Sequence, residues 1–200
     1  MLTELHPGRA RALLFDWDGT LVDSQEANYR AMEAALATQG MRLDQDWFDA
    51  RTGLSSADLI HELLAGTGTR LTVPVDDLVA ARDRHFLVNA DRIRVHAPVA
   101  EVALACHGTL PLAVASGGAR LIIETTIRHL SLERLFTTLV TRDEVDRGKP
   151  APDIFLRAAE ALRTAPADCL VYEDSDEGIE AAHAAGMPVI DVRPVTRPRG

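Results

Sequence analysis

Lysine is almost missing from this chain: Lys149 is the single lysine among 21 basic residues, and all the others are arginines. The two side chains are not equivalent, because lysine offers a compact ammonium on a flexible stem whereas arginine offers a planar fork. Position 149 is therefore a candidate for a site that needs a compact cation and that a fork would not fit.

Aromatic residues and cysteines are also scarce. Aromatics make up 4% of the sequence, so the core must be built from Leu, Val, Ile and Ala. Two cysteines, Cys106 and Cys169, lack the spacing of metal ligands, which favours buried free thiols in a reducing compartment. The sequence has no apolar run near the ~20 residues that cross a bilayer, and its N-terminal segment lacks the apolar stretch of a signal peptide. A formal net charge of −9 argues against nucleic acid and anionic membrane surfaces as partners. We therefore expect a cytoplasmic protein.

Short apolar runs alternate with helical patterns along most of the chain. The apolar runs are typical of buried parallel strands and cover Ala12–Phe15, Pro111–Ala115, Thr138–Val140, Leu170–Tyr172 and Pro188–Asp191. Helical patterns cover Val99–Cys106, Leu121–His129, Asp153–Leu162 and Ile179–Ala185. This alternation predicts an α/β fold with a Rossmann-like, doubly wound parallel sheet.

The interval from residue 24 to residue 95 breaks the alternation, because it contains helical patterns only. These patterns cover Gln25–Gln39, Gln45–Arg51, Ala57–Leu64 and Asp76–Ala90, with Ser55 or Ser56 as the N-cap of the third. We therefore expect an inserted all-helical cap over residues 24–95, between the two parts of an α/β core formed by residues 1–23 and 96–200.

Polar residues follow the predicted strands at their carboxyl ends, where the functional sites of parallel sheets lie. Asp16 and Asp18 follow the first strand, Ser116 and Gly117 the second, and Glu173 and Asp174 the fourth, while Lys149 comes after the third and a longer loop. A group of acids repels itself unless a cation lies among them, and an oxygen-only donor set favours Mg²⁺. Backbone amides at a helix start bind phosphate, and a lysine adds a point charge.

The two acids after the first strand suit phosphoryl transfer. At positions i and i+2 of an extended chain, Asp16 and Asp18 point the same way. One carboxylate can then attack phosphorus while the other delivers a proton to the leaving oxygen. The sequence therefore predicts a phosphoryl-transfer site in which Mg²⁺ and Lys149 offset the charge.

Four ordered motifs carry a resemblance to a known superfamily. FDWDGTLVDS, VASGG, GKPAPD and YEDSDEGIEAAHAAGM resemble, in this order, the haloacid dehalogenase superfamily, and more narrowly its relatives of β-phosphoglucomutase with a helical cap. The resemblance implies Asp16 as the nucleophile and Asp18 as the general acid and base. It implies Mg²⁺ ligation by Asp16, the backbone carbonyl of Asp18 and Asp174, with Glu173 supporting or joining that shell, and phosphate binding by Ser116 and Lys149. Dehalogenases of the superfamily lack the second Asp, so dehalogenation is disfavoured.

Two departures from the mutase pattern favour a hydrolase. Mutases similar to β-phosphoglucomutase carry a cap Arg that grips the distal phosphate of a bisphosphate, and the matching position here is Ser56. The His that they carry near the start of the cap is Asn28 here, and Arg51 is a possible substitute cation. We expect a phosphatase that acts on a small phosphorylated metabolite of the sugar-phosphate type, with Thr20, Asn28, Arg51 and Ser56 as candidate substrate contacts. A phosphomutase is the alternative.

A different class of function also has to be weighed. A receiver-like phospho-acceptor module uses similar residues, but its acceptor Asp follows the third strand and it has no helical insert. A catalytically silent binding protein on the same fold is the other possibility, although the matched motif positions are all occupied here. No large apolar stripe stands out in the sequence, so we expect a monomer.

Overall fold

Five strands form one parallel sheet in the computed structural model, which describes residues 3–51 and 54–196. The order is β5-β4-β1-β6-β7, so the first strand lies in the centre. The strands are β1 (Ala12–Phe15), β4 (Leu112–Ser116), β5 (Thr138–Thr141), β6 (Cys169–Glu173) and β7 (Val189–Asp191). Each starts and ends within about one residue of its predicted run. The boundaries are sharpest in β1, β4 and β6, which are buried throughout, because their continuous apolar runs can only be buried between two layers of helices.

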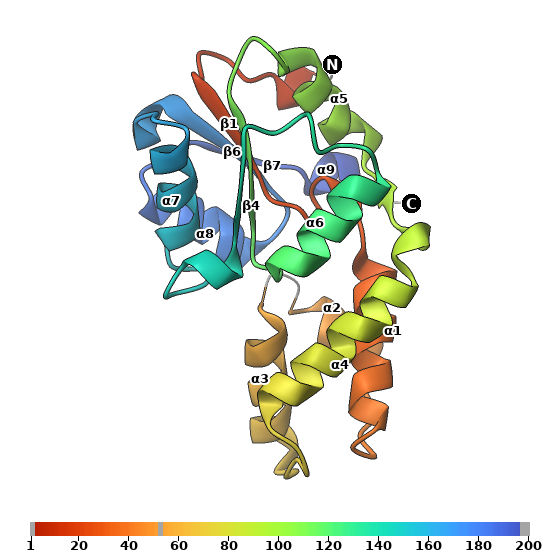
Figure 1. Cartoon of the computed structure of the whole chain (residues 1–200). Helices are drawn as coiled ribbons and strands as arrows, with labels where there is room; N and C mark the ends of the chain where they lie inside the picture. Colours follow the sequence, from red (N-terminus) through yellow and green to blue (C-terminus); the bar gives the residue numbers. More distant parts are fainter. Residues whose placement is uncertain (1–2, 52–53, 197–200) are drawn as a thin grey trace.

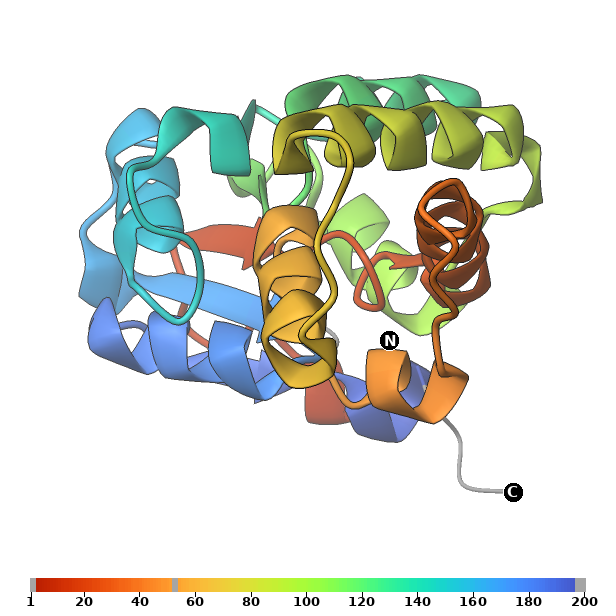
Figure 2. The same ribbon diagram turned by 90° about the horizontal axis from the view of Figure 1, so that it is seen from below.

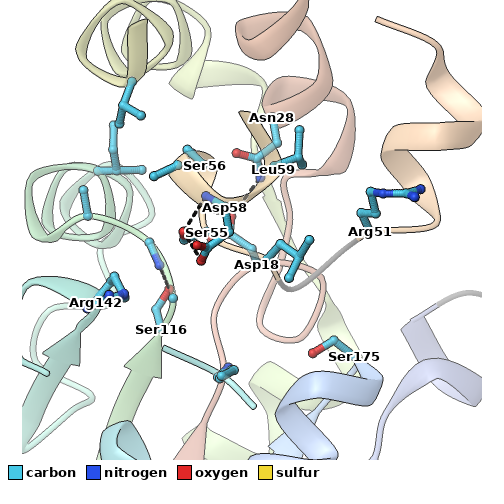
Figure 3. A pocket seen from close by; sticks show the side chains of 18 of the residues that line it. Asp18, Asn28, Arg51, Ser55, Ser56, Asp58, Leu59, Ser116, Arg142 and Ser175 are labelled. Carbon is cyan, nitrogen blue, oxygen red and sulfur yellow. Dashed lines mark hydrogen bonds between the residues drawn. The ribbon is translucent and has the colours of Figure 1, made fainter. Parts of the chain in front are cut away.

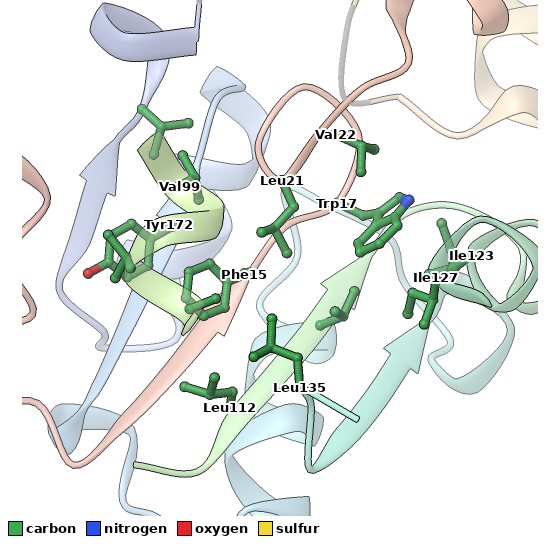
Figure 4. Packing of buried hydrophobic residues seen from close by; sticks show 14 of the residues in the cluster. Phe15, Trp17, Leu21, Val22, Val99, Leu112, Ile123, Ile127, Leu135 and Tyr172 are labelled. Atoms are coloured by element: carbon green, nitrogen blue, oxygen red, sulfur yellow. The ribbon is translucent and has the colours of Figure 1, made fainter. Parts of the chain in front are cut away.

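Two helices cover each face of the sheet, and Figure 1 shows the two layers on either side of β1 and β4. Helices α5 (Ala97–Cys106) and α6 (Arg120–His129) pack against Leu13 and Phe15, whereas α7 (Asp153–Ala161) and α8 (Asp176–Ala184) pack against Ala12 and Leu14. Successive residues of β1 thus serve opposite faces, as the period of a strand requires. Figure 4 shows the first of these clusters, where the rings of Phe15 and Tyr172 stack at 4.8 Å. The predicted doubly wound fold is confirmed.

The cap helices build a hydrophobic cluster of their own. They are α1 (Gln25–Ala37), α2 (Gln45–Asp49), α3 (Ser56–Thr67) and α4 (Val75–Val88). They stand beyond one end of the sheet in Figure 1, and Figure 2 shows the molecule from that end. Tyr29, Leu36, Ile60 and Leu78 are among the buried residues of this cluster. Ser55 is the N-cap of α3, since its side chain accepts a hydrogen bond from the backbone N–H of Asp58.

The junction between cap and core contains strands that the helical prediction misses. β2 (Val22–Asp23) pairs antiparallel with β3 (Arg94–Val95), so the interval 24–95 is not purely helical. Strands of two residues show no alternation that a sequence pattern could reveal. The pair fastens the start and the end of the insert to each other, and the cap boundaries at 23/24 and 95/96 remain a prediction.

Short elements complete the chain, and they are η1 (Thr3–Leu5), η2 (Ala90–Arg92), η3 (Arg142–Glu144), η4 (Pro166–Asp168) and α9 (Arg193–Thr196). Cys106 and Cys169 are buried free thiols, as predicted. Within the described ranges, no helix has the length and apolar character needed to cross a membrane.

Candidate active site

Asp16 lies directly beyond the end of the central strand and is 6% exposed. Its backbone N–H donates to the carbonyl of Tyr172 on the neighbouring strand at 3.0 Å, so the residue still follows the sheet. The next side chain, Trp17, turns away from the acids into the core and donates from Nε1 to Thr126 at 3.1 Å (Figure 4). Burial of Trp17 thereby fixes the backbone between Asp16 and Asp18.

Lys149 joins the first strand to the fourth motif. Its Nζ donates to Asp16 Oδ1 at 2.6 Å and to Glu173 Oε2 at 2.7 Å, and the side chain is only 3% exposed. The ring of Phe155 lies beneath the ammonium, 5.1 Å from ring centroid to Nζ. The single lysine of the sequence thus lies between two buried carboxylates.

Both carboxylate oxygens of Glu173 accept hydrogen bonds. Oε1 accepts from the backbone N–H groups of Asp174 and Ser175 at 3.0 and 3.1 Å, and from the Ser175 hydroxyl at 2.8 Å. Oε2 accepts from Lys149. Because all these donors are used to hold the side chain, Glu173 is positioned as a fixed anchor for the lysine.

Two glycines allow the acids to approach the backbone this closely. A Cβ on Gly178 would lie 2.1 Å from Glu173 Oε2, and a Cβ on Gly19 would lie 2.2 Å from Asp174 Oδ2. Gly19 also has φ +82°, a conformation that favours glycine. Thr20 is fully buried and donates to Asp174 Oδ1 at 3.1 Å, so this candidate substrate contact lies behind Asp174 and is not among the described residues that line the cavity.

The electrostatics of this cluster favour an additional cation. Burial, and then repulsion from Glu173, raise the pKa of Asp16 well above its usual range, although Lys149 pulls it down. Burial alone would lower the pKa of Lys149, but attraction to Asp16 and Glu173 outweighs it and raises that pKa. Asp16, Glu173 and Asp174 each bring a carboxylate oxygen within 4.8 Å of the others. Three acids against one ammonium leave negative charge to be balanced, and oxygen-only donors suit a hard divalent ion.

The turn after β4 supplies the predicted phosphate-binding residues. Ser116 ends the strand and is 1% exposed, and Gly117 and Gly118 follow it on the cavity wall. The Ser116 hydroxyl accepts from the backbone N–H of Gly118 at 3.0 Å, and α6 begins only at Arg120. The Gly118 amide is therefore engaged within the turn, and the expected phosphate-binding amides do not lie at a helix start. The Gly117 amide and the Ser116 hydroxyl remain for an anion.

A cavity of about 460 Å³ lies between the sheet end and the cap, and Figure 3 shows side chains from both parts on its wall. From the core it is lined by Asp16, Asp18, Ser116, Lys149 and Asp174 among others, and from the cap by Asn28, Arg51, Ser55, Ser56, Asp58 and Arg82 among others. Four segments that are distant in sequence thus meet at one cavity, as expected for the carboxyl ends of parallel strands.

Asp18 faces the cap and not the acid cluster, so the expectation that Asp16 and Asp18 point the same way is wrong for their side chains. Its Oδ1 accepts from the Ser24 hydroxyl and from Asn28 Nδ2, the latter at 3.2 Å. Ser24 is itself 1% exposed and immediately precedes α1. Asn28, predicted as a substrate contact, is therefore also a support for Asp18.

The two other cap candidates line the cavity in different ways. Arg51 pairs with Glu62 at 2.5 Å, and its guanidinium stacks over the ring of Trp47 at 4.1 Å. Ser56 lies in the first turn of α3. The neighbouring residues Thr52 and Gly53, which belong to the motif compared with the mutases, lie outside the described residues.

Arg82 on α4 is a cavity residue that the sequence reasoning missed. It is 9% exposed, its Nη1 donates to Asp83 at 2.8 Å, and its Nη2 donates to Asn28 Oδ1. Its Nε makes no hydrogen bond to any described residue. In the sequence, Arg82 lies four residues from both Leu78 and Phe86, the other buried residues of α4, so helical periodicity places it on the buried face and is the signal that could have found it.

Comparison with known proteins gives a consistent result. The model of the haloacid dehalogenase-like hydrolase family matches residues 10–186. The chain is 33% identical over 188 residues to fructose-1-phosphate phosphatase YqaB of Escherichia coli, covering 92% of this chain and 97% of that protein. It is 26% identical over 189 residues to β-phosphoglucomutase of Bacillus subtilis, covering 91% of this chain and 83% of that protein.

Solved structures agree with these matches. The structure of CbbY from Rhodobacter sphaeroides in complex with phosphate superimposes with a TM-score of 0.83 at 25% identity, covering 90% of this chain and 84% of that chain. The β-phosphoglucomutase structure from Clostridium difficile superimposes with a TM-score of 0.80 at 19% identity, over 90% and 83% of the two chains, and shows the shared fold.

Proposed function

The chain belongs to the haloacid dehalogenase-like hydrolases, as its motifs predict, and from this premise we propose that it is a Mg²⁺-dependent phosphatase acting on a small phosphorylated metabolite of the sugar-phosphate type. The observation that carries the proposal is that Lys149 bridges Asp16 and Glu173, close to Asp174. These residues line a cavity whose other wall is formed by the cap. The fructose-1-phosphate phosphatase among the relatives supports a sugar phosphate as the substrate.

Asp16 is the proposed nucleophile. One of its carboxylate oxygens forms a bond to phosphorus while the bond from phosphorus to the ester oxygen breaks, which leaves an aspartyl-phosphate and an alcohol. Lys149, the Ser116 hydroxyl and the Gly117 N–H hold the oxygens of the transferred group. Because Lys149 already touches Asp16, attack and charge neutralisation take place at adjoining atoms.

Asp18 is the proposed acid and base. It gives a proton to the leaving ester oxygen, and the resulting carboxylate then takes a proton from the water that hydrolyses the aspartyl-phosphate. Ser24 and Asn28 hold Oδ1 of Asp18, which leaves its other oxygen for these two transfers. The cap excludes bulk water while the ester is in place.

The acid cluster fits the divalent ion that the family implies. Asp16, Asp174 and the backbone carbonyl of Asp18 would hold it, while Glu173, whose oxygens already accept four hydrogen bonds, would support the site through Lys149. When bound, Mg²⁺ neutralises charge on the phosphoryl oxygens.

The cations on the cap side of the cavity are already paired with carboxylates, and this favours hydrolysis over phosphate migration. A mutase must grip a second phosphate, yet Arg51 is paired with Glu62 and Arg82 with Asp83. The cap wall also carries Ser55, Ser56 and Asp58, which suit the hydroxyl groups of a sugar.

Turnover of p-nitrophenyl phosphate, with Mg²⁺ and with EDTA, tests the proposal. We expect turnover that EDTA abolishes; metal-independent turnover, or none at all, would contradict the mechanism and favour a binding module. A panel of sugar phosphates, polyol phosphates and phosphoglycolate, ranked by kcat/KM, then identifies the substrate. With glucose 1-phosphate, released inorganic phosphate supports the phosphatase, and an isomerised sugar phosphate with little free phosphate would establish the mutase instead.

A further inference from the structure

Arg142 connects the two loops that carry the proposed phosphate-binding residues. It begins η3, directly after β5, and lines the cavity beside Ser116 (Figure 3). Its backbone N–H donates to the carbonyl of Gly118 at 3.3 Å, in the turn after β4. Its side chain extends in the other direction, along the loop that leads to Lys149.

The guanidinium binds the backbone of that loop and not a carboxylate. Nη1 donates to the carbonyl of Val145 at 2.6 Å, and Nη2 donates to the carbonyl of Asp146 at 3.3 Å. A planar fork presents two separate N–H groups to two successive carbonyls in a fixed geometry, whereas a lysine ammonium is one compact centre on a flexible stem and holds no such geometry. The guanidinium of Arg142 thus holds the backbone of this loop.

The stem of Arg142 also packs against the residue before the lysine. A Cβ placed on Gly148 would lie 3.2 Å from Arg142 Nε and 3.4 Å from its Cδ. The side chain therefore spans the loop from Val145 to Gly148, and Lys149 is the next residue along the chain.

Lys149 needs this support because its own hydrogen bonds fix only the ammonium. Nζ is held at 2.6 and 2.7 Å by the two carboxylates, but its backbone belongs to a loop between η3 and α7. A shift of that loop by about 1 Å would change the reach of the ammonium, and misplacement of this size is costly in catalysis.

We propose that Arg142 is a positioning residue that sets Lys149 at a fixed distance from the Ser116–Gly117 turn, acting through the lysine and not by touching substrate. The inference rests on the proposed function, because it assigns Lys149 to the transferred phosphate. This positioning role distinguishes Arg142 from Arg51 and Arg82, the arginines that line the cavity from the cap.

A double-mutant cycle tests the proposal. Arg142→Gln should lower kcat/KM for p-nitrophenyl phosphate, and weaken competitive inhibition by inorganic phosphate, by about tenfold or more. In a Lys149→Met background the same replacement should change either quantity by less than about twofold, because the group through which it acts is gone. Arg142→Lys should fail to restore the loss, since a point charge on a flexible stem does not fix the two carbonyls in the geometry that the fork imposes.

Gly148→Ala gives a second cycle that needs no lysine variant. The added methyl group presses on the guanidinium, so it should weaken phosphate inhibition in the parent enzyme and have no further effect in Arg142→Gln. The matched control is Arg147→Gln in the same loop, whose side chain is 70% exposed and pairs with Asp153, and it should change kcat/KM by less than about twofold.

Three results would overturn the inference: normal kinetics of Arg142→Gln, full recovery with Arg142→Lys, or losses that multiply in both cycles. The last would mean that Arg142 contacts the substrate directly. If the parent enzyme with Mg²⁺ turns over no phosphate ester, the proposed function itself has failed, and this inference fails with it; an active parent with an uncoupled Arg142 rejects the inference alone.

Discussion

Replacing Asp16 with Asn should abolish turnover and yet make the metal-free protein more stable. The substitution keeps the shape of the side chain but removes a charge that is buried beside Glu173 and Asp174. Burial, followed by repulsion from Glu173, raises the pKa of Asp16 even though Lys149 touches it. A raised pKa in a buried acid means that holding its charge costs folding free energy.

The magnitude follows from the distances. With an effective dielectric constant of about 20, two like charges no more than 4.8 Å apart repel by roughly 3 kcal/mol or more, and Asp16 has two such neighbours. The attraction of Lys149 at 2.6 Å is worth about 6 kcal/mol on the same scale and offsets most of that repulsion. Desolvation of the carboxylate, several kcal/mol on its own, then decides the sign. We expect Asp16→Asn to gain at least about 2 kcal/mol, which is about 4 °C or more in Tm for a chain of this size.

The pH dependence gives a second, independent check. Since the pKa of Asp16 is higher in the folded than in the unfolded state, the destabilisation is fully present above the folded pKa and absent below the unfolded value of about 3.9. The difference in Tm between variant and parent should therefore shrink as the pH falls from 7.5 towards 5. Mg²⁺ should also shrink it at pH 7.5, by stabilising the parent more than the variant.

Circular dichroism melts in EDTA, repeated across this pH range and with added Mg²⁺, measure these effects. Asp176→Asn is the matched control, because its carboxylate is 84% exposed, and it should shift Tm by less than about 2 °C. A variant that is less stable than the parent in EDTA, or a difference that grows on acidification, would refute the electrostatic reasoning. Residual turnover by Asp16→Asn would refute its role as nucleophile.

Three further predictions concern the proton donor, the cap and the anchor of the lysine. Asp18→Asn should slow the hydrolysis of an alkyl phosphate by about 10²–10⁴-fold. With p-nitrophenyl phosphate it should still give a burst of nitrophenolate in rapid-quench kinetics, because nitrophenolate leaves without a proton. The absence of a burst would argue against Asp18 as the proton donor. Arg82→Gln should raise KM for a sugar phosphate by about tenfold and leave p-nitrophenyl phosphate nearly unchanged, so equal effects on both would remove Arg82 from the sugar-binding wall. Gly178→Ala should destabilise the protein by more than about 2 kcal/mol in urea unfolding, because its Cβ would lie 2.1 Å from Glu173. The control Gly66→Ala on α3, whose Cβ would have no atom within 4 Å, should be neutral or stabilising. Similar free energies of unfolding for both variants would show that the contact with Glu173 is unimportant.

The sheet could be predicted closely because its information is local. Ala12–Phe15 is apolar throughout, and a run of this kind between Arg11 and Asp16 has few structural alternatives. The order of the motifs along the chain likewise placed Asp16, Ser116, Lys149 and Asp174 together, since the carboxyl ends of parallel strands meet. Ser55 was one of two possible caps, and only its hydrogen bond to the Asp58 amide distinguishes it from Ser56.

The residues that could not be predicted depend on partners from distant segments. Arg82 becomes a cavity residue because α4 packs beside α1, which brings it to Asn28. Thr20 follows the first motif directly, but the fold turns its hydroxyl to Asp174, more than 150 positions away. Arg142 has no motif around it, and only the path of the backbone from Val145 to Gly148 reveals what its fork holds. Helical periodicity places Arg82 on the buried face of α4, but the partners of these residues come from distant segments and no local pattern identifies them.

The scarcity of lysine has a physical explanation at position 149. The ammonium lies within hydrogen-bond distance of Asp16 and Glu173, above the ring of Phe155 and almost without exposure. In the proposed mechanism it must also approach a phosphoryl oxygen. An arginine fork directed at one carboxylate would hold both of its oxygens, and the nucleophilic oxygen of Asp16 would then be occupied. A compact cation instead binds one oxygen of each acid, so Asp16 keeps an oxygen for attack. Elsewhere in the chain arginine serves in ion pairs and in contacts with backbone carbonyls, which are the tasks that a fork performs better.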